Sequence, residues 1–370
     1  MGETSRLHSP SSTAGAIAAP ELAAHIIRFD ADDPSTYSAH TLPMAEIMRS
    51  SAHAPIPWPA GNAPAPSPFP APPSPDAPLP QCDVLVVTWT VEEAKALADT
   101  LTPGYPSKTS WYPYAHLFEN TFRPLIRAGA PALESNRLGS WFLTRISGKR
   151  TICLKSELHM SQDGPKLPIA KLWAQLIAET GAKLVLSTGT AGGIGAPIEL
   201  GDVVVASSVR FDCKKSFAAA SFHDAIYACP QLNGSEFATA EGLFAANAAH
   251  LPTATRAPRI FTVPADGIAP IDVVTTDFFA FDDSTDHYGL QGLGAAVEMG
   301  DAVLGMVISG MGPNAPAWGA VRNASDPQIN STGLTMEQAA NKAAQIYEKF
   351  GYWTTIPSAI TCWAIISALP

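Results

Sequence analysis

The pattern of hydrophobic positions changes abruptly near residue 82 of this 370-residue chain. Before that point apolar residues are scattered, and residues 21–28 (ELAAHIIR) have the spacing of a short helix. Beyond it, continuous apolar runs alternate with segments of helical periodicity. Such alternation is typical of an α/β domain, so we predict an N-terminal arm over residues 1–81 and one domain over residues 82–370.

Two kinds of segment make up the predicted domain. Continuous aliphatic runs predict buried strands at residues 83–87, 151–155, 184–186, 203–205, 271–274, 295–299 and 319–322. Helical periodicity predicts helices at residues 91–98, 167–180, 301–308, 336–350 and 356–368. Thr90 and Glu93 have the spacing of a capping box at the start of the first helix. Gly181 is a typical residue to end the second.

The arm is rich in proline. Residues 55–80 contain twelve prolines, a composition that favours extended polyproline II structure. We expect a linker or an extended arm, part of which packs on the globular body. The simpler expectation is a tail without a chemical role. The alternative is an arm that wraps a partner subunit or covers the mouth of a site.

The most informative stretch runs from Lys183 to Ala206, KLVLSTGTAGGIGAPIELGDVVVA. We predict that its first strand ends in a turn of small residues, Ser187 to Gly195. Small residues at the carboxyl end of a strand let backbone N–H groups approach a ligand, and open α/β sheets place their sites there. The stretch contains neither a dinucleotide fingerprint nor a Walker P-loop. A turn whose glycines only relieve backbone strain is the alternative.

Composition narrows the classes of function. The net charge of −10 argues against a nucleic-acid-binding face, and no uncharged apolar run reaches the 18 residues of a membrane span. Five widely spaced cysteines without a C-x-x-C pair fit reduced thiols in the cytoplasm. We therefore expect a cytoplasmic protein with no nucleic-acid partner and no membrane contact. We also expect no cofactor and no metal.

Polar residues in three clusters accompany the glycine-rich stretch, at residues 92–93, 296–301 and 321–327. Each cluster has a structural explanation when it is taken alone. The capping box by itself would explain Glu93, and a turn before a proline would explain Asp326. Their order along the chain gives them a joint interpretation.

This order is EE, then STGTAGG with LGDVVVA, then TDFFAF with AVEM, then VRNASD. It resembles the nucleoside phosphorylase and nucleosidase superfamily over about residues 83–350, most of all methylthioadenosine/S-adenosylhomocysteine nucleosidase. The resemblance implies a three-layer α/β/α fold with a central mixed, partly closed sheet, and cleavage of the N-glycosidic bond of a purine nucleoside. It also implies a homo-oligomer, since neighbouring subunits often complete the pocket in family members.

The resemblance assigns a role to each motif. Asp326 matches the acid that protonates the purine base, a role that needs a raised pKa, and Ser325 would orient it. Glu93 matches the glutamate that positions the attacking water. The remaining substrate-binding residues that it implies are Thr190, Ala191 and Gly192 beside the nucleophile, Phe279 against the base, and Met299 against the ribose, together with Glu298 and Arg322.

Phosphate is the alternative to water as the co-substrate. Phosphorylases of the superfamily commonly carry an arginine where this chain has Ser187, and another in the first strand–helix turn, where this chain has none. A phosphate dianion without guanidinium partners is poorly held, which favours hydrolysis. Lys155, His159 or Arg210 could still supply a cation and restore phosphorolysis.

One position departs from the family motif V-E-M-E, whose last glutamate binds the two ribose hydroxyls. This chain has Gly300 there. Asp301, one residue on, could take over that contact, or the sugar could differ from ribose, or the protein could be a weakened enzyme. Three functions therefore stay open: a nucleosidase, a phosphorylase and a non-catalytic nucleoside-binding protein.

Overall fold

The computed structural model describes residues 19–38, 42–47, 53–252, 256–262 and 270–370. Its helices are α1 (Ala19–Arg28), α2 (Val91–Leu101), α3 (Ser107–Ser110), α4 (Pro131–Ser135), α5 (Pro168–Thr180), α6 (Phe237–Phe244), α7 (Asp301–Gly310) and α8 (Met336–Ser367). Its strands are β1 (Ala65–Pro66), β2 (Val84–Thr88), β3 (Tyr112–Tyr114), β4 (Gly139–Ile146), β5 (Lys149–Ser156), β6 (Leu184–Gly193), β7 (Val203–Val205), β8 (Ser208–Phe211), β9 (Ile226–Ala228), β10 (Ile260–Phe261), β11 (Asp272–Thr275), β12 (Ala296–Glu298) and β13 (Ala317–Asp326).

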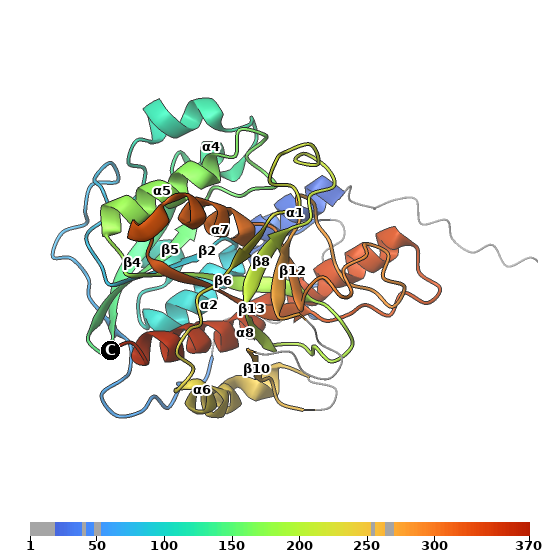
Figure 1. Cartoon of the computed structure of the whole chain (residues 1–370). Helices are drawn as coiled ribbons and strands as arrows, with labels where there is room; N and C mark the ends of the chain where they lie inside the picture. Colours follow the sequence, from blue (N-terminus) through green and yellow to red (C-terminus); the bar gives the residue numbers. More distant parts are fainter. Residues whose placement is uncertain (1–18, 39–41, 48–52, 253–255, 263–269) are drawn as a thin grey trace, which may run out of the picture.

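A mixed sheet runs through the middle of the molecule, with helices on both faces (Figure 1). Helices α5 and α7 cover one face, and α2 and α8 cover the other. From one edge the strand order is β1-β4-β5-β2-β6-β12-β11-β8-β9, and β13 pairs with both β6 and β7. This arrangement confirms the predicted three-layer α/β/α fold.

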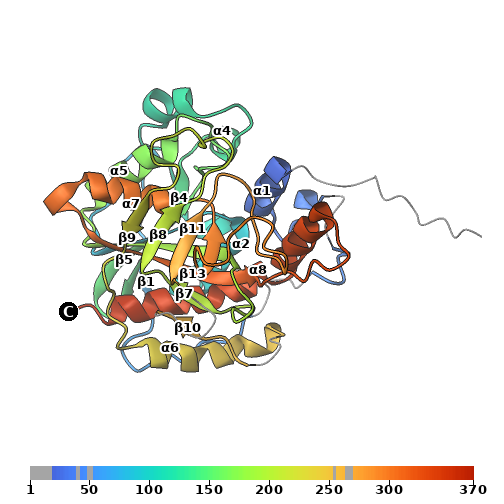
Figure 2. The same cartoon turned by 45° about the vertical axis from the view of Figure 1, so that its right-hand side comes forward.

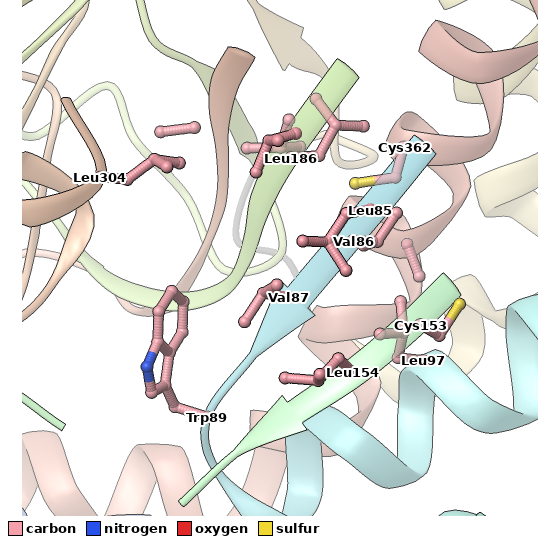
Figure 3. Packing of buried hydrophobic residues seen from close by; sticks show 14 of the residues in the cluster. Leu85, Val86, Val87, Trp89, Leu97, Cys153, Leu154, Leu186, Leu304 and Cys362 are labelled. Atoms are coloured by element: carbon pink, nitrogen blue, oxygen red, sulfur yellow. The ribbon is translucent and has the colours of Figure 1, made fainter. Parts of the chain in front are cut away.

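The main core lies between the sheet and its helices (Figure 3). All of β2 and most of β5 are buried on both faces, which explains the uninterrupted apolar runs in their sequences. Leu97 of α2 and Cys362 of α8 belong to the same cluster as these strands. All five cysteines are free thiols, and none forms a disulfide.

Strand β6 lies at the branch point of the sheet, where it pairs with β2, β12 and β13. It continues to Gly193, so the predicted turn from Ser187 is wrong over most of its length. The physical reason is a parallel ladder with β13 that extends from Leu184 to Gly192 and holds the small residues as a strand. Consequently the glycine-rich segment and residues 322–326 lie side by side on two paired strands.

The C-terminal helix is also longer than predicted. The periodicity predicts a break over residues 351–355, yet α8 is one helix of 32 residues with Pro357 inside it. Thr354 and Thr355 direct their hydroxyls to the Gly351 carbonyl just before the proline, and the buried helix packs on β13 and β6. None of the helices in the described part of the chain combines the length and the apolar character needed to cross a membrane.

The N-terminal arm contributes structure to the body. Residues 21–28 are helical as predicted, within α1, which lies near the N-terminal half of α8 (Figures 1 and 2). Leu22, Ala23 and Ile26 of α1 share an apolar cluster with Ala339 and Ala343 of α8. This second cluster is separate from the main core, and it brings the arm close to the end of the sheet that carries the candidate site.

Candidate active site

A cavity lies at the carboxyl ends of β6, β12 and β13, beside the first turn of α2. It is lined by Ile26, Ile27, Trp89, Thr90, Glu93, His159, Thr190, Ala191, Gly192, Phe279, Ala280, Val297, Glu298, Met299, Gly300, Arg322, Ser325, Asp326 and Tyr347. The structure thus brings together every site residue that the sequence predicts except Asp301.

Glu93 is buried at the start of α2, where it completes the predicted capping box with Thr90. Its Oε2 accepts hydrogen bonds from the Thr88 hydroxyl at 2.7 Å and from the N–H groups of Trp89 and Thr90, both at 2.9 Å. Its Oε1 accepts from the N–H and the hydroxyl of Thr190, at 2.7 and 2.6 Å. The same carboxyl therefore caps a helix and joins it to β6.

Gly189 makes room for this carboxyl group. Its φ is +141°, and a Cβ at this position would lie 2.5 Å from Glu93 Cδ. Burial alone would raise the pKa of Glu93, but the charge of Arg322 and the hydrogen bonds that Glu93 accepts lower it below the ordinary value. A glycine on β6 thus lets an ionised carboxylate reach Thr190.

Asp326 is the last residue of β13 and is buried beside Gly192 of β6. The Ser325 hydroxyl donates to Asp326 Oδ1 at 2.8 Å, and this carboxyl accepts no other hydrogen bond from the residues that the structure describes. Burial raises the pKa of Asp326 to about 7, with only a partial opposing effect from Ser325. Asp326 can therefore hold a proton near neutral pH.

Strand β6 sets the spacing of the two carboxyl groups. Glu93 binds Thr190, whereas Asp326 pairs with Gly192, two residues further along β6. A strand rises about 3.3 Å per residue, so these contacts are roughly 7 Å apart along β6. This separation places an ionised and a protonatable carboxyl group on either side of one small space.

Arg322 of β13 is buried and faces acceptors from two other elements. Its Nε donates to Asp301 Oδ2 at 2.7 Å, and its Nη2 donates to the Ser187 hydroxyl at 3.0 Å. Asp301 also accepts a hydrogen bond from Ser187, is fully buried and does not line the cavity. Asp301, which was expected to contact the sugar, has its carboxylate engaged with the guanidinium of Arg322.

Glu298 lies beside Gly300 and faces the cavity. A Cβ at Gly300 would lie 3.6 Å from Glu298 Oε2, an ordinary contact distance. Glu298 Oε1 accepts from the Thr275 hydroxyl and from the N–H of Asp301, whereas Oε2 lies 3.4 Å from Arg322 Nη2. Burial, and next the Asp301 carboxylate, raise the pKa of Glu298. Glu298 thus presents one loosely held oxygen to the space that Gly300 leaves open.

The apolar side of the cavity contains residues that sequence reasoning did not identify. Phe279 and Met299, which it did identify, pack in the second apolar cluster with α1. Ile26, Ile27 and Tyr347 extend this side of the cavity. They belong to no motif, and the helical spacing of residues 21–28 was the only signal for the first two. The arm is therefore part of the cavity wall rather than a tail remote from it.

His159 lines the cavity. Among the lysine and arginine residues that the structure describes, only Arg322 lines it as well. Burial lowers the pKa of His159 to about 4, so the imidazole is uncharged at neutral pH. Lys155 and Arg210, the other two candidate cations, do not line the cavity. Over the described ranges, no group of three or more His, Cys, Asp or Glu side chains could hold a metal ion.

Comparison with known proteins gives a family and several similar folds. The model of the phosphorylase superfamily matches residues 128–350. Among solved structures, the chain is similar to 5′-methylthioadenosine/S-adenosylhomocysteine nucleosidase from Neisseria meningitidis, with 18% identity, a TM-score of 0.46, and coverage of 77% of this chain and 99% of that one.

Two structures from Helicobacter pylori are similar to a comparable degree. The 5′-methylthioadenosine/S-adenosylhomocysteine nucleosidase is 16% identical, with a TM-score of 0.48 and coverage of 78% of this chain and 99% of that one. The futalosine hydrolase is 14% identical, with a TM-score of 0.46 and coverage of 77% and 97%. No curated protein sequence matches the chain.

Proposed function

We propose that this chain, which belongs to the phosphorylase superfamily, is a nucleosidase that hydrolyses the N-glycosidic bond of a purine nucleoside, with 5′-modified adenosines among its candidate substrates. One observation carries the proposal: two carboxyl groups in one cavity have opposite pKa shifts. The pKa of Asp326 is raised to about 7, and that of Glu93 is lowered. Carboxyl groups whose environments separate their pKa values commonly divide acid and base roles.

Asp326 is the general acid in this mechanism. As the bond between C1′ and the purine nitrogen breaks, its electron pair moves to the base. Asp326 donates its proton to the base, and the Ser325 hydroxyl holds the other carboxyl oxygen. Phe279 lines the cavity, and we assign its ring to contact with the purine. The base then leaves without a negative charge, which lowers the barrier.

Glu93 and Thr190 hold the attacking water. The Thr190 hydroxyl donates its single hydrogen to Glu93 at 2.6 Å, so its lone pairs can accept a hydrogen bond from water. The negative charge of Glu93 stabilises the positive charge that develops on the sugar as the base departs. The water oxygen bonds to C1′ and its proton passes towards Glu93, giving a free base and a free sugar.

The charges in the cavity support water over phosphate as the co-substrate. The guanidinium of Arg322 is already engaged with Asp301 and lies over the ring of Trp89, at 4.8 Å from the ring centroid. The ionised Glu93 would repel a phosphate dianion placed near Thr190. Phosphorolysis is the alternative, and it would require Arg322 to exchange Asp301 for phosphate.

We assign the sugar hydroxyls to Glu298 rather than to Asp301. Glu298 Oε2 faces the space left open by Gly300, whereas Asp301 is fully buried. The raised pKa of Glu298 keeps this carboxyl group largely uncharged near neutral pH, so each hydrogen bond to a sugar hydroxyl is expected to contribute about 1 kcal/mol. Met299, which also lines the cavity, would lie against the sugar ring.

The deciding experiment is base release from adenosine, inosine and 5′-methylthioadenosine, with and without phosphate. Hydrolysis predicts release in phosphate-free buffer and no sugar 1-phosphate among the products. Release that depends on phosphate would instead establish a phosphorylase. Adenine binding without release from any nucleoside would establish a nucleoside-binding protein. Cytoplasmic location and homo-oligomeric assembly stay predictions.

A further inference from the structure

Residues 19–37 lie outside the part of the chain that the superfamily model matches, so family membership gives them no role. They are nevertheless part of the candidate site. Ile26 and Ile27 of α1 both line the cavity, and their exposed fractions are only 6% and 4%. A segment separated from the domain by a proline-rich chain thus supplies two side chains to the cavity.

The arm and the substrate-facing wall are packed as one unit. Ile26 and Phe29 of the arm share the second apolar cluster with Phe279 and Tyr347, and Met299 packs against it. The rings of Phe29 and Tyr347 make an edge-to-face contact at 6.5 Å between centroids. The position of α1 therefore affects the same side chains that would contact the substrate.

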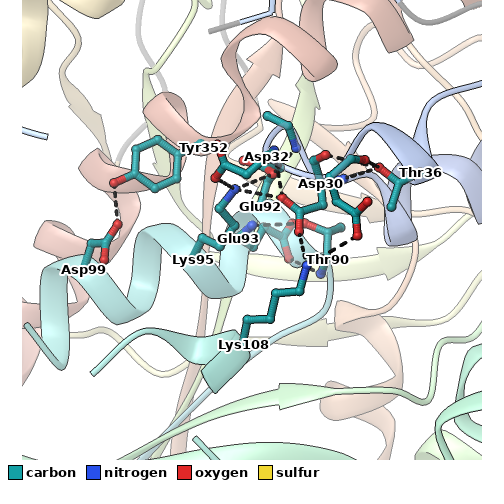
Figure 4. A network of polar contacts seen from close by, with 12 residues as sticks. Asp30, Asp32, Thr36, Thr90, Glu92, Glu93, Lys95, Asp99, Lys108 and Tyr352 are labelled. Carbon is teal, nitrogen blue, oxygen red and sulfur yellow. Dashed lines mark hydrogen bonds and ion pairs between the residues drawn. The ribbon is translucent and has the colours of Figure 1, made fainter. Parts of the chain in front are cut away.

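Polar contacts hold the arm on α2 (Figure 4). Lys95 Nζ binds the carboxylates of Asp30 at 3.0 Å and Glu92 at 3.1 Å, and it also contacts Asp32. The N–H of Ala31 donates to Glu92 Oε1 at 2.8 Å. These contacts are made to the first turns of α2, next to Glu93, which we propose holds the attacking water.

A second attachment holds the arm on α8. His25 Nε2 lies 2.7 Å from Glu348 Oε1, and the N–H of Leu42 donates to Glu348 Oε2 at 3.1 Å. Glu348 is buried, so this contact is shielded from water. The arm is thus attached to both helices that border its side of the cavity.

The arm's side of the cavity is uncharged. Ile26, Ile27 and Tyr347 carry no charge at neutral pH, and His159, which also lines the cavity, is neutral at that pH because burial lowers its pKa to about 4. Asp326 is assigned to the base, Glu93 and Thr190 to the water, and Glu298 to the sugar hydroxyls, so the 5′ substituent is the part of the nucleoside that has no assigned partner. Ile26 and Ile27 line the cavity without another assignment and are therefore available to this substituent.

We infer that residues 19–37 form a cap on the site within the same chain, and that Ile26 and Ile27 determine its specificity for an uncharged, apolar 5′ substituent. This inference rests on the proposed function. An alkyl substituent gains from burial against two isoleucines. A 5′-phosphate would lose its water without meeting a cation among the described residues of this wall.

The test compares kcat/KM for 5′-methylthioadenosine, adenosine and adenosine 5′-monophosphate in the full-length chain. The wild type should prefer them in that order. Ile26→Ala and Ile27→Ala should each lower the preference for 5′-methylthioadenosine over adenosine by about tenfold, because each removes apolar contacts made only with the first substrate. Ile126→Ala is the matched control: it removes the same atoms from a buried isoleucine of the main core that does not line the cavity, so the preference should stay that of the wild type.

Two further measurements keep the test decisive. Ile27→Val, which removes one methylene and should fold, must shift the preference in the same direction by a smaller factor. Substrate bound to the full-length Asp326→Asn variant should slow hydrogen exchange in residues 19–37. If the wild type is active and both alanine variants keep its preference for 5′-methylthioadenosine over adenosine, the inferred role of the arm is wrong. The proposed nucleosidase activity is unaffected by that result. Wild type that releases no base from any nucleoside would instead overturn the proposed function.

Discussion

The two sides of the cavity are built in different ways. On the side of the sheet, Glu93 and Asp326 are fixed by the ladder between β6 and β13 and by hydrogen bonds from backbone and hydroxyl groups. On the side of the arm, Ile26 and Ile27 are held by apolar packing, by an ion pair to α2 and by a hydrogen bond to α8. The two carboxyl groups proposed for catalysis are thus held by strands of the main core, whereas the two isoleucines proposed for substrate selectivity belong to the arm, which packs through the second apolar cluster.

The difference indicates how the two properties can be separated. A change on the sheet side should alter the rate for every nucleoside alike, because it acts on the glycosidic bond that all share. A change on the arm side should alter the choice among nucleosides, because it acts on a part in which they differ. The following changes test that division.

The largest effect is expected for Asp326→Asn. The amide cannot donate the proton that the leaving base needs, so kcat should fall by about 10²–10⁴-fold for all nucleosides. Adenine binding and the unfolding temperature should change little, since asparagine keeps the shape and can accept the Ser325 hydrogen bond. Turnover at the wild-type rate would remove Asp326 from the mechanism.

Gly189→Ala should displace Glu93 without changing it chemically. The new Cβ would lie 2.5 Å from Glu93 Cδ, on a backbone whose φ of +141° disfavours alanine. We expect a loss of kcat of about 100-fold from misplacement of the carboxylate, with a lower free energy of unfolding. The matched control is Gly242→Ala in α6, where a Cβ meets nothing within 4 Å, and it should leave activity intact.

The pH profile of kcat/KM tests the two pKa shifts. The acid form of Asp326 is lost as pH rises through its pKa of about 7, so activity should fall about tenfold per unit above that value. The base form of Glu93 is lost only when pH falls below its lowered pKa, so the acid limb should lie below the range of an ordinary glutamate. A profile that is flat from neutral to alkaline pH would contradict the acid role.

Glu298→Gln should weaken recognition of the sugar. Kinetics with adenosine and 2′-deoxyadenosine measure this, and we expect the preference for the ribonucleoside to fall by up to about tenfold, because the amide can place an N–H group where the carboxyl group has an oxygen acceptor. Asp301→Asn is the comparison variant. It disturbs the buried contact with Arg322 and should lower stability, yet the ribose preference should remain.

The smallest effect is expected at Lys108. Its side chain is 63% exposed, whereas that of Lys95, which also binds Asp30, is 14% exposed. Lys108→Met should therefore change the free energy of unfolding by less than about 1 kcal/mol. Lys95→Met leaves the buried Glu92 carboxylate without its cation and should speed hydrogen exchange in residues 19–37. Equal effects of the two substitutions would argue against a specific attachment of the arm.

Local patterns in the sequence predicted much of the sheet side. The capping box of Thr90 and Glu93 needs residues only three positions apart, and its geometry is as expected. The motif around Asp326 likewise pointed to a residue that lies in the cavity. The extent of β6 was not predictable in the same way, because its ladder with β13 joins residues more than a hundred positions apart.

The direction of the Asp301 side chain shows a second limit. At the start of α7 its sequence context allows it to point towards a ligand or away from one. The buried Arg322 and Ser187, from two other strands, decide that it points away, and they leave Glu298 to face the cavity. Sequence proximity to Gly300 therefore did not indicate which of the two carboxyl groups lines the cavity.

The sequence predicted the buried central strands and several helices, because helix caps and hydrophobic periodicity depend on neighbours within a few positions, but it did not indicate β4, β8 or α6. It also pointed to most of the polar groups that line the cavity. Tertiary structure decided the charge state of those groups, and it decided that residues of the N-terminal arm form the apolar side of the cavity. The pKa of Asp326 depends on burial, which no local pattern reports. The arm reaches the cavity because α1 packs on α8, and Tyr347 there bonds to Thr90, a partner 257 positions away.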